Sequence, residues 1–132
     1  YKIINRRSPL TIDNNRAWCV HKILNFNKML SESLFFIGNH DLNAFRSSHC
    51  QSKTTIKTIK SLNIKQSSDN IIISVSAKSF LHSQVRIMVG TLVDIGKGLL
   101  KTSIEEIIIS KDRSQAGQTA PACGLYLKKI EY

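Results

Sequence analysis

Cysteine is scarce in this sequence of 132 residues, and its spacing does not suit a disulfide framework. The three cysteines are Cys19, Cys50 and Cys123, an odd number that contains no Cys-x-x-Cys pair. Histidine does not complete a zinc site, because His21 and His49 each lie within two residues of a cysteine, closer than the usual zinc ligand spacings. The sequence therefore argues against a disulfide-stabilised fold and against a bound metal.

Long apolar runs are also missing. No stretch approaches the roughly 20 apolar residues that a membrane-spanning helix requires, and the start, YKIINRRSPL, lacks the apolar segment of a signal peptide. We therefore expect a cytoplasmic protein. The length predicts a single α/β domain over residues 1–132, because a chain of this size buries enough surface to fold without covalent cross-links.

Several motifs that would define an enzyme or a nucleotide-binding protein are absent. The chain has no Gly-x-Ser-x-Gly elbow, no Cys/His pair in a recognised context and no glycine loop that could bind phosphate. An RNA-recognition motif would stack bases on aromatic side chains of a central strand, but the segment NIIISVSA at 70–77 contains no aromatic residue. RNA contacts would therefore have to come from loops, basic side chains and a groove.

Positive charge is what the chain has in excess. Nineteen Lys and Arg residues against nine Asp and Glu residues give a net charge of +10, and the basic residues are scattered along the whole chain. This distribution favours a polyanionic partner such as a nucleic acid. A high charge that only confers solubility is the alternative at this point.

The apolar periodicity predicts six main elements in the order β-α-β-β-α-β. The first helix should begin after Asn25 as N-cap and end before Gly38 as C′ residue. A short extended piece at 16–23 and a short helix at 102–110, whose Ser103 and Glu106 form a capping box, complete the pattern. The main elements are strands at 1–5, 53–66, 70–77 and 125–132 and helices at 26–37 and 81–97. This is an α+β, split β-α-β-β-α-β (ferredoxin-like) plan, with a four-stranded antiparallel sheet and two long helices on one face.

The segment SFLHSQVRIMVGTLVDIGKG at 79–98 is an apolar helix that carries one arginine near its middle. Counting from Val85, apolar side chains recur at the i, i+3, i+4 and i+7 positions of a core-facing stripe. Arg86 lies on the border of this stripe, and His82 lies on the same side one turn earlier. Arg86 is either a surface residue with a buried stem or a forked cation held where the sheet and the helix meet.

Three stretches together resemble a known family. GNHDLNAFRSSHCQSKTTIKTI, FLHSQVRIMVGTLVDIGKG and KDRSQAGQTAPACGLYLKKIEY are similar, in this order, to the C-terminal half of bacterial tRNA pseudouridine synthase A, the TruA family. The resemblance extends along nearly the whole chain and includes NRR near the start and RAW at 16–18. Ser83 and Gln84 replace a histidine and a methionine that are frequent in the family, and Gln118 stands where proline or threonine is common.

The resemblance implies an activity. Members of this family isomerise uridine to pseudouridine in the anticodon arm of tRNA, at positions 38 to 40, without metal or organic cofactor, and generally act as homodimers. Their catalytic domain has two similar halves, and the nucleophilic aspartate belongs to an Arg-x-x-Arg-Thr-Asp motif of the N-terminal half. None of the five aspartates in this chain follows Arg-Thr. We therefore expect the second half alone, with the N-terminal half and its nucleophile absent and the chain inactive by itself.

The resemblance also assigns roles to individual residues. Arg86 corresponds to the family arginine that pairs with the catalytic aspartate, and a bidentate guanidinium would keep that carboxylate ionised and aimed. His82 either lines the groove or caps the helix. Tyr1 matches the second tyrosine of a Tyr-x-Tyr pair whose first member lies near the base in the family. Leu125 supplies apolar wall against the uracil, and Gly124 permits close approach of the backbone. The structural alternative for this segment is a loop with a proline turn that leads into an ordinary edge strand.

Further residues resemble the tRNA-binding loop of the family. Phe45 and Arg46 match its tRNA-contacting positions, and Gln51 and Lys53 are candidate phosphate contacts. A buried aromatic side chain, a solvated arginine and an ordinary strand-edge lysine are the structural alternatives for this loop. For the whole chain, the alternatives to an isomerase fragment are a stand-alone RNA-binding module and a ferredoxin-like interaction domain that does not bind nucleic acid.

Overall fold

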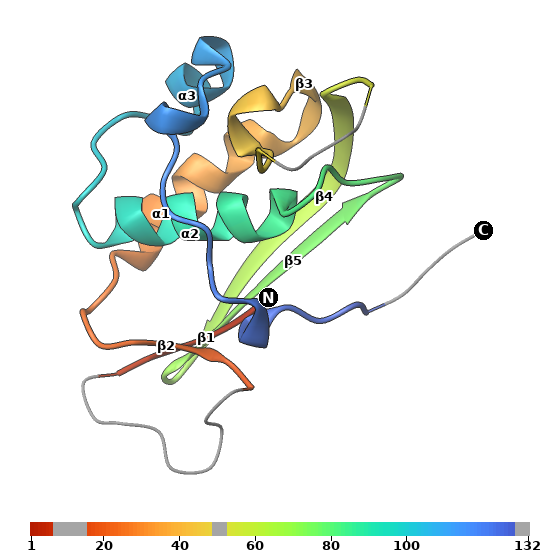
Figure 1. The fold of residues 1–132 in the computed structure, drawn as a ribbon. Helices are drawn as coiled ribbons and strands as arrows, with labels where there is room; N and C mark the ends of the chain where they lie inside the picture. Colours follow the sequence, from red (N-terminus) through yellow and green to blue (C-terminus); the bar gives the residue numbers. More distant parts are fainter. Residues whose placement is uncertain (7–15, 49–52, 129–132) are drawn as a thin grey trace.

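The computed structural model describes residues 1–6, 16–48 and 53–128, which form an α+β fold with one sheet. The α+β fold class predicted from the sequence is confirmed (Figure 1). Short 3-10 helices, labelled η, lie between the longer elements. In chain order the elements are β1 (Lys2–Asn5), β2 (Trp18–Val20), α1 (Phe26–Ser33), η1 (Leu34–Phe36), β3 (Gly38–Asp41), η2 (Asn43–Phe45), β4 (Ile56–Ser67), β5 (Asn70–Ala77), α2 (Gln84–Gly96), α3 (Ile104–Ser110), η3 (Arg113–Gln115) and η4 (Ala122–Gly124).

The sheet has five strands within the described residues, in the order β2-β1-β5-β4-β3. The predicted hairpin is confirmed, because β4 and β5 pair antiparallel up to Ser67 and Asn70 and leave a two-residue turn. Ser68 in this turn has a φ of 54°, as tight hairpin turns require. β1 pairs antiparallel with β5, so the first strand lies inside the sheet.

The sheet differs from the predicted four-stranded antiparallel plan in three ways. β3 was missed because its sequence, GNHD, has no β-branched residue, and pairing with β4 sets its conformation instead. β2, predicted as a short extended piece, pairs parallel with β1 and occupies the edge beside it. The predicted last strand is wrong for residues 125–128, which are not in a strand, and residues 129–132 lie outside the described ranges.

The first helix begins where the sequence indicates but is shorter than predicted. Asn25 caps α1, accepting a hydrogen bond from the Lys28 backbone N–H at 3.1 Å. The helix ends at Ser33 and not at 37, because the next turn tightens into η1. Gly38, predicted as its C′ residue, is the first residue of β3 and has a φ of 109°.

The N-terminus of α2 also differs from the prediction. The helix starts at Gln84, three residues later than predicted, because Ser83 has a φ of 61° and interrupts the helical path. The Gln84 Oε1 atom accepts from the Leu81 N–H at 2.9 Å and closes this turn. In α3, Ser103 is the N-cap as predicted, but its Oγ accepts from the N–H of Glu105 and not of Glu106.

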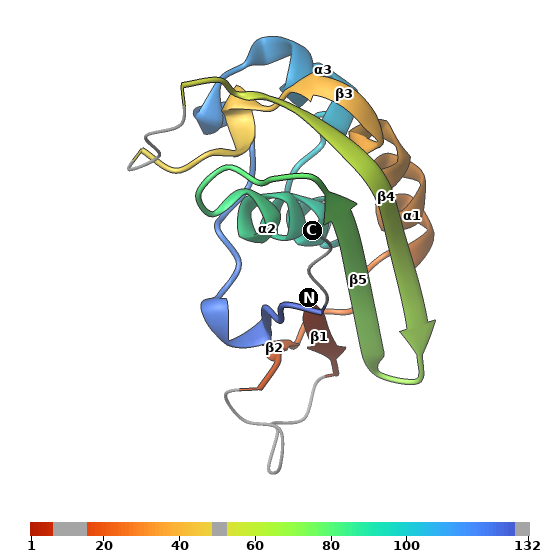
Figure 2. The same ribbon diagram turned by 90° about the vertical axis from the view of Figure 1, so that its right-hand side faces the viewer.

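One face of the sheet carries the core. Ile3, Leu62, Ile64, Ile71 and Ile73 are buried on this inner face, and each fully buried aliphatic side chain contributes about 1.5–3 kcal/mol. Figures 1 and 2 show α1 and α2 together on one side of the sheet, and both helices contribute buried residues to the same core cluster.

The other face of the sheet, the outer face, is not covered by the two long helices. Lys2, Asn63, Lys65, Ile72 and Ser74 alternate with the core residues and therefore lie on this face. None of the helices in the described ranges has the length and apolar character that a membrane crossing requires. The outer face of β5 is the surface on which the candidate site is built.

Candidate active site

A groove of about 800 Å³ lies between the outer face of β5, the first turn of α2 and the segment after η4. Ile72, Phe80 and Leu125 form part of its apolar wall, and each keeps about 40% of its surface exposed (39%, 41% and 42%). Partly exposed apolar side chains of this kind can pack against a planar ring such as a nucleobase.

The charged side chains that line the groove all carry positive charge. They are Lys2, Arg86 and Lys128, and no acidic side chain among the described residues lines the groove. A groove of this composition attracts an anionic ligand. It also contains the guanidinium of Arg86, and no described carboxylate that lines the groove pairs with it.

The guanidinium of Arg86 is bonded to the described residues through its Nε atom alone. It is the third residue of α2 and is half-buried, and its Nε donates to the Ala120 carbonyl at 2.7 Å. The Ala120 N–H in turn donates to the Arg86 carbonyl at 3.0 Å. The two terminal nitrogens of Arg86 have no hydrogen-bond partner among the described residues, which leaves the forked end of the guanidinium available to a carboxylate or a phosphate.

Tyr1 lies against the same segment. Its side chain is almost fully buried, and its hydroxyl donates to the Pro121 carbonyl at 2.5 Å. Burial raises the pKa of the Tyr1 phenol above its ordinary value, so the hydroxyl remains a donor at neutral pH and also at moderately alkaline pH. Arg86 and Tyr1 are therefore both anchored, by the carbonyls of Ala120 and Pro121.

Gly124 and Leu125 continue this wall of the groove. A Cβ atom at Gly124 would lie 2.7 Å from both the Lys2 carbonyl oxygen and the Tyr1 ring, so only glycine allows this approach to β1. Leu125 follows directly and lines the groove. Arg86, Tyr1 and Leu125 thus meet at one groove although they lie far apart in the sequence.

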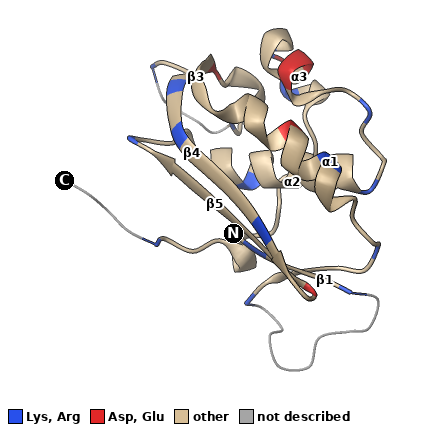
Figure 3. Ribbon diagram, turned by 180° about the vertical axis from the view of Figure 1, so that it is seen from behind, with Lys and Arg blue, Asp and Glu red and all other residues tan. Residues whose placement is uncertain are grey.

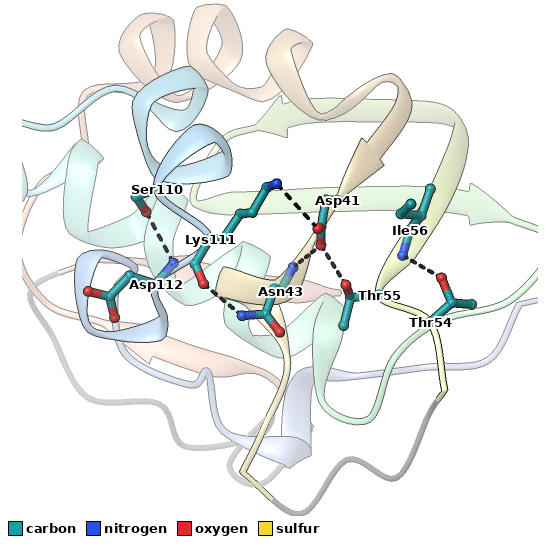
Figure 4. A network of polar contacts seen from close by, with 8 residues as sticks. All are labelled: Asp41, Asn43, Thr54, Thr55, Ile56, Ser110, Lys111 and Asp112. Carbon is teal, nitrogen blue, oxygen red and sulfur yellow. Dashed lines mark hydrogen bonds and ion pairs between the residues drawn. The ribbon is translucent and has the colours of Figure 1, made fainter.

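The loop between β3 and β4 forms a second part of the candidate site. Asp41, at the end of β3, forms hydrogen bonds with residues at both ends of this loop (Figure 4). The Asp41 Oδ1 atom accepts from the Asn43 N–H at 3.2 Å and from the Thr55 hydroxyl at 2.5 Å. Its other oxygen lies 3.8 Å from the Lys111 Nζ, and Asn43 Nδ2 donates to the Lys111 carbonyl at 2.7 Å. The loop is therefore fastened to the end of α3 as well as to its own strands.

His82 connects this loop to the turn before α2. Its Nδ1 atom lies 2.7 Å from the Ser47 hydroxyl, and the Ser47 N–H donates to the His82 carbonyl at 3.2 Å. The exposed His82 side chain is not among those that line the groove, and the turn before α2 is closed by Gln84. The structure thus places His82 at the junction between the loop and the Arg86 helix.

The loop residues differ widely in exposure. Phe45 is fully buried, and its ring makes an edge-to-face contact with Phe36 at a centroid distance of 5.0 Å. Arg46, the next residue, is half-exposed, and Lys53 is exposed. Gln51 lies outside the described residues. A buried aromatic anchor beside an accessible arginine is a suitable arrangement for presenting a cation to a phosphate.

Basic residues are spread over the described part of the molecule and do not form a single cluster. Figure 3 shows Lys and Arg along β4, on the helices and in several loops, whereas Asp and Glu occupy fewer places. Such a distribution raises the potential over a broad surface. The groove and the β3–β4 loop lie within this basic surface.

Sequence reasoning missed some residues of the groove. Ile72 shares its side of the alternating strand with Ser74 and Ser76, a pattern typical of a polar face. Phe80 lies before the helix and outside its apolar stripe. The two atoms that anchor Arg86 and Tyr1 are backbone carbonyls, which any residue type can supply. No sequence pattern could have identified them.

The described fold and groove define an α+β domain with a basic, apolar-walled site on the outer face of its sheet. The family model for tRNA pseudouridine synthase matches residues 35–132. Curated proteins named tRNA pseudouridine synthase A align with the whole chain, with 53% identity in Ehrlichia chaffeensis, 47% in Neorickettsia sennetsu and 43% in Parvibaculum lavamentivorans. The chain covers 54% of each of these proteins, and so spans about half the length of the curated relatives it matches.

The chain therefore belongs to the tRNA pseudouridine synthase family, as the sequence motifs predict.

Proposed function

We propose that this chain is the C-terminal half of the catalytic domain of a tRNA pseudouridine synthase. The observation that carries the proposal is Arg86, whose guanidinium is fixed through Nε and which lines a groove without a lining acid among the described residues. A nucleophilic aspartate from an N-terminal half would complete the pair. Bidentate pairing would keep that carboxylate ionised inside a site closed to water.

The proposed reaction is the isomerisation of uridine in the anticodon arm of tRNA, at positions 38 to 40. The bond between ribose C1′ and uracil N1 breaks, a bond between C1′ and uracil C5 forms, C5 loses its proton to solvent, and N1 gains a proton. The apolar wall around Leu125 and Ile72 would hold the uracil during this change, and Tyr1 would support the wall through its bond to Pro121. Arg46 and Lys53, together with Gln51, would contact phosphates of the arm.

The experiment joins this chain to an N-terminal half taken from a relative, as one polypeptide. We expect release of tritium from unmodified tRNA labelled at uracil C5, because that position loses its hydrogen when the new bond forms. The chain alone should bind the tRNA and release no tritium. A joined protein whose Arg-Thr-Asp aspartate is replaced by asparagine is the matched control and should also be inactive.

Two outcomes would contradict the proposal. A joined protein that binds tRNA and still releases no tritium would favour a stand-alone RNA-binding module. Binding no stronger than that of a charge-matched unrelated protein would favour an interaction domain that does not recognise nucleic acid. A homodimer and a cytoplasmic location stay predictions of the resemblance.

A further inference from the structure

Residues 117–121, which we call the strap, pack against α2 and end beside Arg86 and Tyr1, two residues that line the groove. Figure 1 shows this segment crossing α2 on its way from α3 towards β1. Gly117 N–H donates to the Thr91 hydroxyl at 2.9 Å, and Ala120 forms the two bonds with Arg86 described above. The strap therefore contacts α2 from Thr91 back to Arg86 and supplies the carbonyl that anchors the guanidinium.

The strap and the helix touch through their backbones. A Cβ atom on Gly90 would lie 1.8 Å from the Gln118 carbonyl oxygen, and a Cβ atom on Gly117 would lie 2.7 Å from an Asp94 oxygen. Neither position has room for a side chain. A displacement of the strap along α2 would thus be transmitted to Ala120 without being absorbed by flexible side chains.

Asp94 fixes the position of the strap along the helix. Its Oδ2 accepts from the Gln118 N–H at 3.1 Å, and its Oδ1 accepts from Gln118 Nε2 at 2.7 Å. Asp94 lies eight residues after Arg86, two turns along the same helix face. It does not line the groove, so it has no direct contact with anything bound there.

We propose that Asp94, acting through Gln118 and the strap, is a positioning residue for the guanidinium of Arg86. The inference rests on the proposed function, in which the terminal nitrogens of Arg86 aim a carboxylate. Without Asp94, Gln118 is no longer held at one position along α2, so the strap can shift. The Ala120 carbonyl would move with the strap, and the Arg86 guanidinium bonded to it would turn. Misplacing a catalytic group by about 1 Å can reduce turnover up to about 10²-fold.

The experiment uses the protein in which this chain is joined to an N-terminal half. One variant removes the hydrogen bonds between Asp94 and Gln118, and a second exchanges the donor and the acceptor of their side-chain hydrogen bond. Asp94→Ala removes both hydrogen bonds to Gln118. The double variant Asp94→Asn with Gln118→Glu restores both with the side-chain direction reversed, and it keeps the net charge. We expect Asp94→Ala to lower kcat about tenfold with KM for tRNA within about twofold, and the double variant to recover most of the loss.

A second measurement does not depend on activity. The exchange of the Arg86 Nε–H with water reports its bond to Ala120, and its NMR signal is identified by its absence in Arg86→Lys. We expect exchange to be at least about tenfold faster in Asp94→Ala than in the parent, since an opened hydrogen bond no longer protects the proton. Glu105→Ala, which removes an exposed helical carboxylate from α3, is the matched control and should change neither quantity.

The outcomes separate the two proposals. A parent enzyme without activity overturns the proposed function, and the exchange rate of Arg86 Nε–H then decides whether Asp94 still positions the guanidinium. Unchanged exchange in Asp94→Ala overturns the positioning role. If the parent enzyme is active, two further results overturn the positioning role. One is a higher KM with unchanged kcat in Asp94→Ala, and the other is a double variant that does not recover the lost kcat.

Discussion

At Arg86, one donor of the guanidinium serves the fold and the others remain for a partner. Nε donates to Ala120, and neither terminal nitrogen has a partner among the described residues. In the joined enzyme, Arg86→Lys keeps the charge but loses both the anchor and the fork. We expect kcat to fall about 10²-fold or more, with KM for tRNA little changed. Normal turnover in this variant would make Arg86 a purely structural residue.

Tyr1 is the residue whose ionisation should couple the groove to pH. Burial raises the pKa of its phenol in the folded chain above the ordinary value of about 10. A raised pKa in the folded chain contributes stability that is fully present below pH 10, where Tyr1 is protonated in both the folded and the unfolded chain. This stability is lost as the pH rises above 10, because the unfolded chain then loses the proton first.

Replacing Tyr1 with phenylalanine should separate the hydrogen bond from this pH effect. We expect Tyr1→Phe to lower the free energy of unfolding by about 0.5–1.5 kcal/mol at pH 8, because the Pro121 carbonyl loses its donor. The difference from the parent should shrink as the pH is raised above 10 in urea titrations. Tyr126→Phe is the matched control. Tyr126 also donates to a carbonyl, that of Arg16, but is 55% exposed, so its loss should be smaller.

Among the elements, α2 combines two glycines with opposite surroundings. A Cβ atom added to Gly90 would clash with backbone, because it would lie 1.8 Å from the Gln118 carbonyl oxygen. A Cβ atom added to Gly96 would lie 2.7 Å from the sulfur of Met29, which belongs to a flexible side chain. We therefore expect Gly90→Ala to destabilise the chain by about 2–3 kcal/mol or more, and Gly96→Ala by clearly less. Thermal unfolding of the two variants compares them directly, and equal losses would show that the strap can move away from α2.

The sequence predicted the elements whose own residues determine them. Alternation in NIIISVSA identified β5 and its hairpin, and the helical stripe from Val85 identified α2. β3 and the absence of a strand at 125–128 could not be predicted in the same way. GNHD becomes a strand only through β4, and LYLK alternates like a strand although the edge beside β1 is occupied by β2.

The same distinction applies to the candidate site. Arg86 drew attention because a cation beside an apolar stripe conflicts with the helix pattern. Phe45 and His82 were singled out by motif, but burial against Phe36 and the contact with Ser47 depend on the tertiary fold. Asp94 resembles any polar residue on a helix surface, and only the path of the strap gives it a distinct role.

For the whole molecule, the net charge of +10 should make tRNA binding strongly dependent on salt. Each phosphate contact adds about 0.7–0.9 to the slope of log affinity against log salt concentration. We expect Arg46→Gln and Lys53→Gln each to reduce this slope by up to about 1 for a tRNA anticodon arm. Lys28→Gln on α1, where Lys28 pairs with Glu32 at 3.5 Å, is the control. A slope that is equal in all three variants would place the phosphate contacts elsewhere.

The central position of β1 has a consequence for how the chain folds. β4 and β5 meet across a two-residue turn, whereas Lys2 of β1 and its partner Ile72 of β5 are separated by about half of the chain. Closing such a long loop costs much more entropy than closing a hairpin, and non-local pairing slows folding. The β4–β5 hairpin should therefore form early, and β1 should enter the sheet late. Because Gly124 packs on β1 and the Tyr1 hydroxyl binds Pro121, the groove would be among the last parts of the molecule to assemble.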